Sequence, residues 1–478
     1  MGFFSTAGTS CDSLVCMSRT FRAWRLDEPL LLPPSVQDFV PPDHLSRFVV
    51  SLVRESLELR AIYAVYSGEK GQPPYDPRMM VALLLYSYAV GLYSSRRIAR
   101  ACRERTDFLL LVALDGPDFR TVSEFRRRHL AALSELFVQV LRLAERAGLV
   151  KLGHVALDGT KIKANASKHK AMSYERMKKR EAELKAEVER WLAAAEAADA
   201  EEDRLYGDKR GDEMPDWMAD KQKRLAKIAE AKAALEAEAE AAAEEETRRR
   251  AEAEKQRLAE RRKKNHKAPL SVPLERLAAG GTMFRREPAP PKAEPEAKTQ
   301  RNFTDPESRI LKTRDGFIQG YNAQAAVDAK AQIIVAQGLT PGQSDQDQLV
   351  PLVDAIADNL GRKPKEVSAD SGYCSEANLA ALAKREIAGY IAVGRAKHAA
   401  EPKRNVAGPL TQAMRRKLKR AGRRSRYRLR KQLPEPVFGQ IKQARGFRQF
   451  LLRGVEKVTA EWAMICTAHN ILKLAKAT

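Results

Sequence analysis

Three acidic residues stand at positions where they could together bind metal ions. Asp158 follows the apolar run of residues 154–157, Asp370 follows the strand-like segment 365–369, and Glu435 lies between two prolines at the predicted start of a helix. Carboxylates are hard oxygen ligands that suit Mg²⁺ or Mn²⁺. Two such ions about 3.5–4 Å apart can activate a water or hydroxyl and stabilise the leaving oxygen of a phosphoryl transfer. The pattern is compatible with metal-dependent phosphoryl transfer that needs no protein nucleophile.

Each of these residues also has a purely structural explanation. Asp-Gly is a common turn dipeptide, so the sequence predicts a strand that ends at Asp158 and turns at Gly159. Asp370 precedes Ser-Gly, which also forms turns. Glu435 could be a first-turn acid favoured by the helix dipole. Only their neighbours favour a catalytic role.

A dense run of cations lies directly before Glu435. Eleven of the seventeen residues from Arg415 to Lys431 are Lys or Arg, and Tyr427 is interleaved with them. Such runs are usually solvated faces, but one beside a candidate metal site also suits a DNA backbone. We expect Arg423 and Arg424 of this run to contact DNA. The formal charge of the whole chain, +23, favours a polyanionic partner, nucleic acid before a membrane surface.

Cysteine usage and hydropathy argue against several other classes of protein. The five cysteines are scattered and show no CxxC spacing, which indicates reduced thiols in the cytoplasm and argues against a zinc site. No run approaches the roughly 20 apolar residues of a membrane span. The N-terminal residues lack the basic region and long apolar core of a secretory signal. We expect a cytoplasmic, nucleoid-associated protein without a membrane contact.

Shifts in composition divide the chain into segments. One long stretch is rich in Ala, Glu, Lys and Arg and has apolar residues at a spacing of three to four on both sides of a breaker-rich stretch, which predicts a helical hairpin with a thin coiled-coil seam. A Pro-rich linker follows it. The predicted division is an irregular extension (1–42), a helical DNA-binding domain (43–150), a catalytic domain in two pieces (151–167 and 301–478), the hairpin insertion (168–267) and the linker (268–300).

The helical segment contains one arginine-rich helix that could contact DNA. It begins on Ser94 as a predicted cap and carries Arg96, Arg97 and Arg100. A solvated helix face explains these residues about as well as a DNA-contacting helix does.

The two catalytic pieces alternate strand-like and helical patterns. Their order is a strand, the large helical insertion, two strands, and then helix, strand, helix, strand and helix. This order predicts an α/β (α+β) unit with a mixed sheet and helices packed on it.

The chain resembles the DDE transposases of bacterial insertion sequences, specifically the IS1182 group within the broader IS4/IS5-like set. Blocks that carry the resemblance include "DGPDFRTVSEFRRRH", "VALDGTKIKANAS", "VSADSGYCSEANL" and "YRLRKQLPEPVFGQIKQARGFRQF", and their order matches from Phe21 onward. The resemblance implies an RNase H-like core whose DDE triad falls on Asp158, Asp370 and Glu435. It also implies Mg²⁺ as cofactor, for which Mn²⁺ can substitute.

The resemblance further implies particular DNA contacts. The family's Y-R-E-K signature falls on Tyr427, Arg430, Glu435 and Lys442. Because Arg430 is one residue further from the glutamate than is usual, Arg428 or Lys431 could take its role. Lys442 is expected to face the same DNA as the glutamate.

Such enzymes bind terminal inverted repeats of double-stranded DNA, cut there with water and join the freed 3′-OH to target DNA. Two ends must be processed together, so a homodimer or higher assembly is expected. Similar proteins begin near "MSRTFR", which makes Met17 an alternative start. Two other functions stay open: an RNase H-like nuclease that cuts without joining, and a domesticated DNA-binding protein without catalysis.

Overall fold

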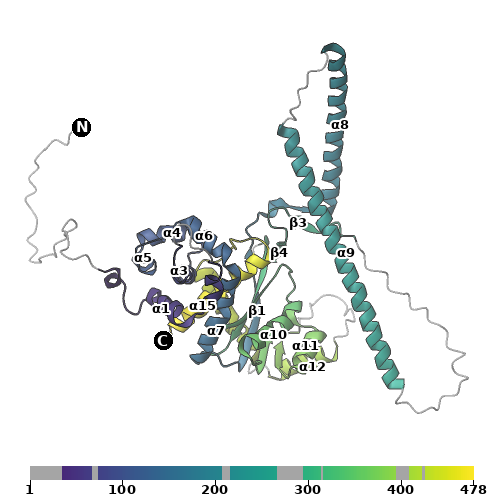
Figure 1. Cartoon of the computed structure of the whole chain (residues 1–478). Coiled ribbons are helices and arrows are strands. Elements are labelled where there is room, and N and C mark those ends of the chain that lie inside the picture. The colour runs from purple at the N-terminus through teal and green to yellow at the C-terminus, as the bar shows by residue number, and fades with distance from the viewer. Residues whose placement is uncertain are drawn as a thin grey trace, which may run out of the picture.

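Figure 1 shows the computed structural model of the chain, which has a helical cluster, a central mixed sheet and a long helical hairpin that projects from the sheet. The mixed α/β class predicted from the sequence is confirmed. The structure describes residues 35–66, 74–206, 216–265, 294–313, 316–393, 408–421 and 426–477.

The central sheet has six strands in a mixed arrangement. The first strand lies inside it, antiparallel to the long β5 on one side and parallel to β7 on the other. The two halves of β5 pair on its outer edge with β4 and β6, and β8 extends the sheet beyond β7. Its strands are β1 (His154–Lys163), β4 (Arg309–Thr313), β5 (Gly316–Asp328), β6 (Ile334–Thr340), β7 (Glu366–Ala369) and β8 (Ala388–Ile391).

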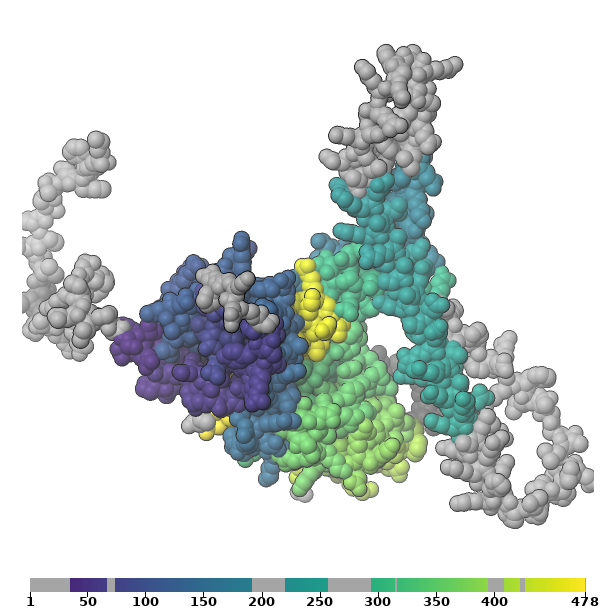
Figure 2. Space-filling view, in the orientation of Figure 1, coloured from purple at the N-terminus to yellow at the C-terminus, as the bar shows by residue number. Residues whose placement is uncertain are grey.

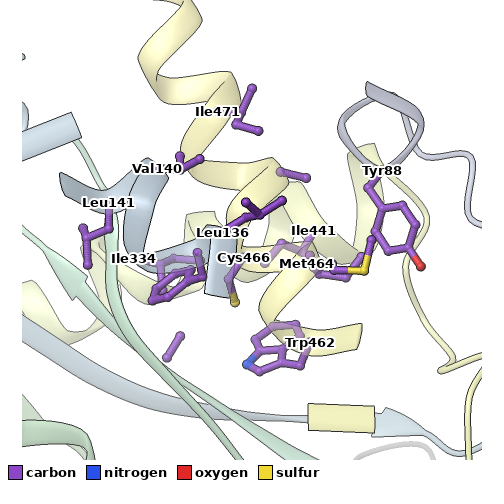
Figure 3. Packing of buried hydrophobic residues seen from close by; sticks show 14 of the residues in the cluster. Tyr88, Leu136, Val140, Leu141, Ile334, Ile441, Trp462, Met464, Cys466 and Ile471 are labelled. Carbon is purple, nitrogen blue, oxygen red and sulfur yellow. The ribbon is translucent and has the colours of Figure 1, made fainter. Parts of the chain in front are cut away.

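The N-terminal helices share one hydrophobic core with this sheet. The C-terminal helix α15 (Val455–Ala475) packs against α3, α7 and β6, so it joins the two regions. Figure 3 shows this junction, where Met464 and Cys466 lie between Tyr88, Leu136 and Ile334. The helices are α1 (Leu45–Ser51), α2 (Arg60–Tyr63), α3 (Pro77–Ala89), α4 (Ser95–Glu104), α5 (Thr106–Leu111), α6 (Phe119–Arg128) and α7 (Leu130–Arg146).

Five further helices complete the sheet region. The first of them packs on β6, and the next two lie against β8. The last two carry the chain across β1 before a π-helical turn at Gln440–Ala444. These helices are α10 (Leu349–Leu360), α11 (Glu376–Lys384), α12 (Pro409–Ala421), α13 (Leu429–Gln432) and α14 (Pro434–Gly439).

The hairpin consists of α8 (Tyr174–Tyr206) and α9 (Asp216–Asn265), which cross near the sheet and extend away from it (Figures 1 and 2). The strands β2 (Ala171–Ser173) and β3 (Gln300–Asn302) pair at its base. A small core there contains Tyr174, Met177, Leu184, Ile228, Ala231 and Leu235.

Glu181 and Lys232, two charged residues within this apolar seam, pair with each other across it. Their charged atoms are 2.7 Å apart, and the Glu181 side chain is only 8% exposed. An ion pair therefore bridges the two helices where their apolar contact is interrupted.

The described residues include no helix long and apolar enough to cross a membrane. Cys102, Cys374 and Cys466 are free thiols. Cys11 and Cys16 lie outside the described residues.

Candidate active site

Asp158 lies in the middle of β1. The strand continues to Lys163, and Gly159 pairs with Gln324 of β5. The turn predicted at Asp158-Gly159 is therefore wrong, because antiparallel pairing with β5 keeps both residues extended. Glycine has another use here: a Cβ at position 159 would lie 2.5 Å from Gln324 Nε2 and 2.8 Å from Asp345 Oδ1. Any larger residue would displace these two side chains.

Parallel pairing between β1 and β7 places Asp370 beside Asp158. The last registered pair is Ala156 with Ser368, and each aspartate lies two residues further along its strand. Because neighbouring strands are about 4.8 Å apart, the two carboxyl groups share one region of the sheet. Asp370 follows the end of β7 and caps the next turn, where its Oδ1 accepts a hydrogen bond from Gly372 N at 2.8 Å.

Arg430 lies between Glu435 and this pair of aspartates. Glu435 lies in the first turn of α14, as the sequence predicted, and its side chain is 56% exposed. Arg430 Nη1 lies 3.8 Å from Asp370 Oδ2, and Arg430 Nη2 lies 4.0 Å from Glu435 Oε1. The guanidinium thus stands between the second and third acids of the predicted triad.

The pKa of Asp158 is raised to about 7 in total, and burial is the largest cause. The Asp370 and Asp345 carboxylates also raise this pKa, while Arg430 and the Gly159 N–H, 2.9 Å from Asp158 Oδ1, lower it. Like charges close together in a buried site favour a cation that can neutralise them.

Asp345 is a fourth acid at this site, and the sequence interpretation missed it. Its Oδ1 accepts hydrogen bonds from Asn322 Nδ2 and Gln324 Nε2, both at 2.7 Å. A Cβ at Gly372 would lie 3.1 Å from Asp345 Oδ2, so this carboxylate lies between the glycines that follow the two catalytic candidates. The available signal was the pair Asn322 and Gln324, two polar residues at a spacing of two in a mostly apolar strand.

Gln324 links this site to the core. Its side chain accepts a hydrogen bond from the Tyr373 hydroxyl, and its backbone oxygen accepts one from Trp462 Nε1 at 2.9 Å. Trp462 belongs to α15 and is fully buried. The core thereby fixes the amide that holds Asp345.

The donor set at this site fits a hard divalent cation in part. Asp158 and Asp370 offer adjacent carboxylate oxygens, which suit Mg²⁺ or Mn²⁺. Glu435 is held to them only through Arg430, whose Nε is buried without a hydrogen-bond partner among the described residues. Consistent with this, no three metal-ligating side chains in the described ranges are grouped closely enough to hold an ion.

The residues of the Y-R-E-K pattern occupy different environments. Arg430 stacks over the Tyr427 ring with its guanidinium carbon 5.9 Å from the centroid. Of the alternatives considered for Arg430, Arg428 and Lys431 are exposed, and Arg430 is the one that reaches the acids. Lys442 is partly buried and its Nζ donates to the Lys161 carbonyl at 2.8 Å, so it braces β1; burial lowers its pKa to about 8.

Some cations of the basic run before Glu435 make contacts within the protein. Lys417 Nζ donates to the Gly389 carbonyl at 2.8 Å and lies 4.1 Å from the Tyr390 ring centroid. Arg426 pairs with Glu366 at 2.6 Å. Arg423 and Arg424 lie outside the described residues.

The predicted DNA-contacting arginines of α4 are all exposed. Arg96 stacks over Phe119 at 5.3 Å, Arg100 pairs with Glu104 at 2.7 Å, and Arg97 forms no ion pair with any described residue. Ser94 occupies the N-cap position of this helix, but its side chain makes no capping hydrogen bond. Figure 1 places α4 on the side of the molecule away from the hairpin.

Comparison with known families gives two matches. Residues 34–128 match the family described as Transposase domain (DUF772), and residues 281–471 match the Transposase DDE domain. The second match includes Asp370 and Glu435, whereas Asp158 precedes the hairpin and lies outside both ranges. It implies the RNase H-like fold predicted from the sequence, which is thereby confirmed. No curated protein and no solved structure matches the chain.

Proposed function

We propose that the chain binds the terminal inverted repeats of an insertion sequence, cuts there with water and joins the freed 3′-OH to target DNA. The chain belongs to the DDE transposases of the IS1182 group, metal-dependent enzymes that act on DNA. Asp158, Asp370 and Glu435 are the proposed catalytic residues and metal ligands. Mg²⁺ is the proposed cofactor, with Mn²⁺ as a substitute.

The observation that carries this proposal is the parallel register of β1 and β7. It sets Asp158 and Asp370 at equivalent positions on adjacent strands. Arg430 then connects this pair to Glu435. Three acids from distant parts of the sequence thus gather around one guanidinium, although any one of them alone would have a structural explanation.

Divalent ions bound by these acids would supply a metal-activated water or 3′-OH and would stabilise the leaving oxygen. The chain's own residues prepare the site for this chemistry. Asp345 is held in place by two amides beside Asp158 and Asp370. Arg430 offsets the like charge of the acids and is a fork of donors that suits a phosphate. Lys442 braces the strand that carries Asp158.

DNA contacts outside the triad are proposed for two regions. The exposed arginines of α4, Arg96, Arg97 and Arg100, would contact the element ends. Tyr427, Arg430 and Lys442, together with Arg423 and Arg424, would contact DNA near the acids. A homodimer or higher assembly would bring two ends together.

The central experiment replaces Asp158 with alanine. Asp158→Ala should abolish Mg²⁺-dependent cleavage of the DNA ends that flank the gene, while binding to those ends stays nearly intact. Asp358→Ala removes an exposed carboxylate from α10 and serves as the control. Cleavage retained by Asp158→Ala would overturn the assignment.

A second assay separates cutting from joining. Wild-type protein given a pre-cleaved end and a target duplex should produce a joined product. Cutting without any joined product would instead favour a nuclease. DNA binding without nicking in either Mg²⁺ or Mn²⁺ would favour a non-catalytic DNA-binding protein.

A further inference from the structure

A hollow of about 720 Å³ opens where the hairpin leaves the sheet. The segment 169–172 after β1, both hairpin helices and Phe303 form its walls. Part of its lining is apolar and buried or half-buried, namely Met172, Leu184, Ile228 and Phe303. The rest is almost entirely cationic.

Six lysine and arginine side chains line this hollow, and Glu183 is the only acid among the described residues that line it. Arg180 pairs with Glu183 at 2.9 Å. Four of the others are exposed and form no ion pair with any described residue. The six cations are Lys170, Arg176, Lys179, Arg180, Arg224 and Lys227. The four exposed cations without an ion pair are Arg176, Lys179, Arg224 and Lys227.

These unpaired cations contrast with several other cations of the hairpin. Arg176 and Lys179 are three residues apart on α8, and Arg224 and Lys227 are three apart on α9, so each pair lies on one helix face. Several lysines and arginines elsewhere in the hairpin do have acidic partners. Examples are Lys178 with Glu294, Lys185 and Lys232 with Glu181, Lys221 with Glu187, and Arg249 with Glu245.

The hollow continues toward the candidate active site. A second hollow of about 350 Å³ shares Lys170 with it and is also lined by Asn165, Gln449 and Arg453. This second hollow lies just beyond the end of β1, the strand that carries Asp158. The five steps along the strand from Asp158 to Lys163 span about 16 Å at roughly 3.3 Å per residue, which is roughly five base pairs of B-form DNA at about 3.4 Å per base pair.

We propose that the base of the hairpin binds the phosphate backbone of duplex DNA, in continuity with the duplex that is cut at Asp158 and Asp370. Only the continuity with the cut duplex rests on the proposed function. The cationic hollow can bind DNA whether or not the acids cut it. Duplex DNA presents closely spaced phosphates along its length, which match cations contributed by two helices and the segment after β1. The hairpin thereby acts as a DNA-binding arm.

The test is the salt dependence of DNA binding by the full-length protein. The triple variant Arg176→Ala, Lys179→Ala and Arg224→Ala removes three unpaired cations. If each contacts a phosphate, the slope of log Kd against log salt should flatten by about 2.7 for a labelled linear duplex of arbitrary sequence. The charge-matched control is Arg248→Ala, Arg249→Ala and Lys255→Ala, exposed cations of α9 that do not line the hollow, and its slope should match that of wild type.

The outcomes separate this inference from the proposed function. An unchanged slope for the hairpin-base variant, in a preparation whose wild-type protein cuts DNA, would overturn the inference and leave the function standing. A flattened slope in a protein that never cuts would support the inference and count against the function. Equal flattening in both variants would show only a general charge effect. Loss of self-association in the absence of DNA, measured by sedimentation and with an unchanged slope, would show that the hollow binds a second copy of the chain and would overturn the inference.

Discussion

The basic run of residues 415–431 and the base of the hairpin are both cationic, but they use their charge differently. The run is the denser of the two in sequence, yet Lys417, Arg426 and Arg430 turn toward carbonyls, rings or acids of the protein. At the hairpin base fewer cations are spread over two helices, and four of them form no ion pair with described residues. A cation in a dense run is therefore not always available to a partner.

The difference has a physical cause. Lys417, Arg426 and Arg430 of the run lie over strand ends and acids, where a carbonyl or carboxylate is within reach. The hairpin helices leave the sheet, so their cations meet few protein acceptors beyond those on the facing helix. Substitution of a run residue that contacts the protein should thus change catalysis or stability, whereas substitution of an unpaired cation in either region should change the salt dependence of DNA binding.

Arg430 should give the largest effect in the basic run. Arg430→Ala removes the group that links Asp370 to Glu435, and strand cleavage should fall by about 100-fold or more. The affinity for Mn²⁺ without DNA should not decrease, because a guanidinium beside the acids repels a metal ion. Single-turnover cleavage and calorimetric titration with Mn²⁺ measure the two effects.

Arg430→Lys is the matched variant, since it keeps the charge but loses the planar fork of donors. It should cleave faster than Arg430→Ala and slower than wild type. If Arg430→Ala lost Mn²⁺ binding and cleavage together, Arg430 would be holding the acids in place and would have no direct role toward the phosphate.

Asp158 should make the metal-free protein less stable as the pH rises. Its pKa is raised from 3.8 to about 7, so the folded state holds this proton more tightly than the unfolded chain does. The resulting stability is fully present below about pH 4 and is lost as the pH rises to about 7, by an amount on the order of 4 kcal/mol at about 1.4 kcal/mol per pKa unit. Urea unfolding in a chelating buffer at several pH values measures it.

Asp158→Asn should remove the fall in stability that Asp158 causes between about pH 4 and pH 7. Its curve of unfolding free energy against pH should therefore be flatter than that of wild type. Glu461 also has a pKa raised by burial to about 7, and its share remains in both proteins. Parallel curves for wild type and Asp158→Asn would show that Asp158 titrates normally.

The order of the elements could be predicted from the sequence because periodicity and breakers are local. Alternation predicted the two strands β5 and β6 after the insertion, and helical spacing predicted the helices α10, α11 and α15 that follow them in alternation with strands. The error at Asp158-Gly159 has a non-local cause. A turn dipeptide stays extended there because β5 pairs along the whole of β1 and because Asp345 and Gln324 fill the space beside the glycine.

The candidate site depended still more on non-local structure. The sequence suggested three acids, but their proximity follows from the register between β1 and β7 and from the path of α13 and α14 across β1. Nothing local distinguished Arg430 from Arg428, since both lie in the same cationic run. Asp345 stands at the start of a predicted helix, and only the fold places it against Gly159 and Gly372.

Exposed cations of the basic run should still contribute to DNA binding. Arg415, Arg416 and Lys419 are exposed on α12. Replacing all three with alanine should flatten the salt dependence of duplex binding by about 2.7 if each contacts a phosphate. An unchanged slope would mean that this face of α12 is only solvated, and the hairpin base would then be the stronger DNA contact of the two regions.

Lys417, in the same helix, should give the smallest effect and the clearest contrast. Its Nζ is committed to the Gly389 carbonyl and the Tyr390 ring, and burial lowers its pKa. Lys417→Met keeps the apolar stem and removes the charge, so the salt dependence should stay at the wild-type value while the free energy of unfolding falls by about 1 kcal/mol. Denaturant unfolding and the salt titration are run on the same preparation. A slope that flattens by about 0.9 with no loss of stability would show that Lys417 leaves β8 to contact a phosphate, and the contrast between committed and available cations would not hold for this residue.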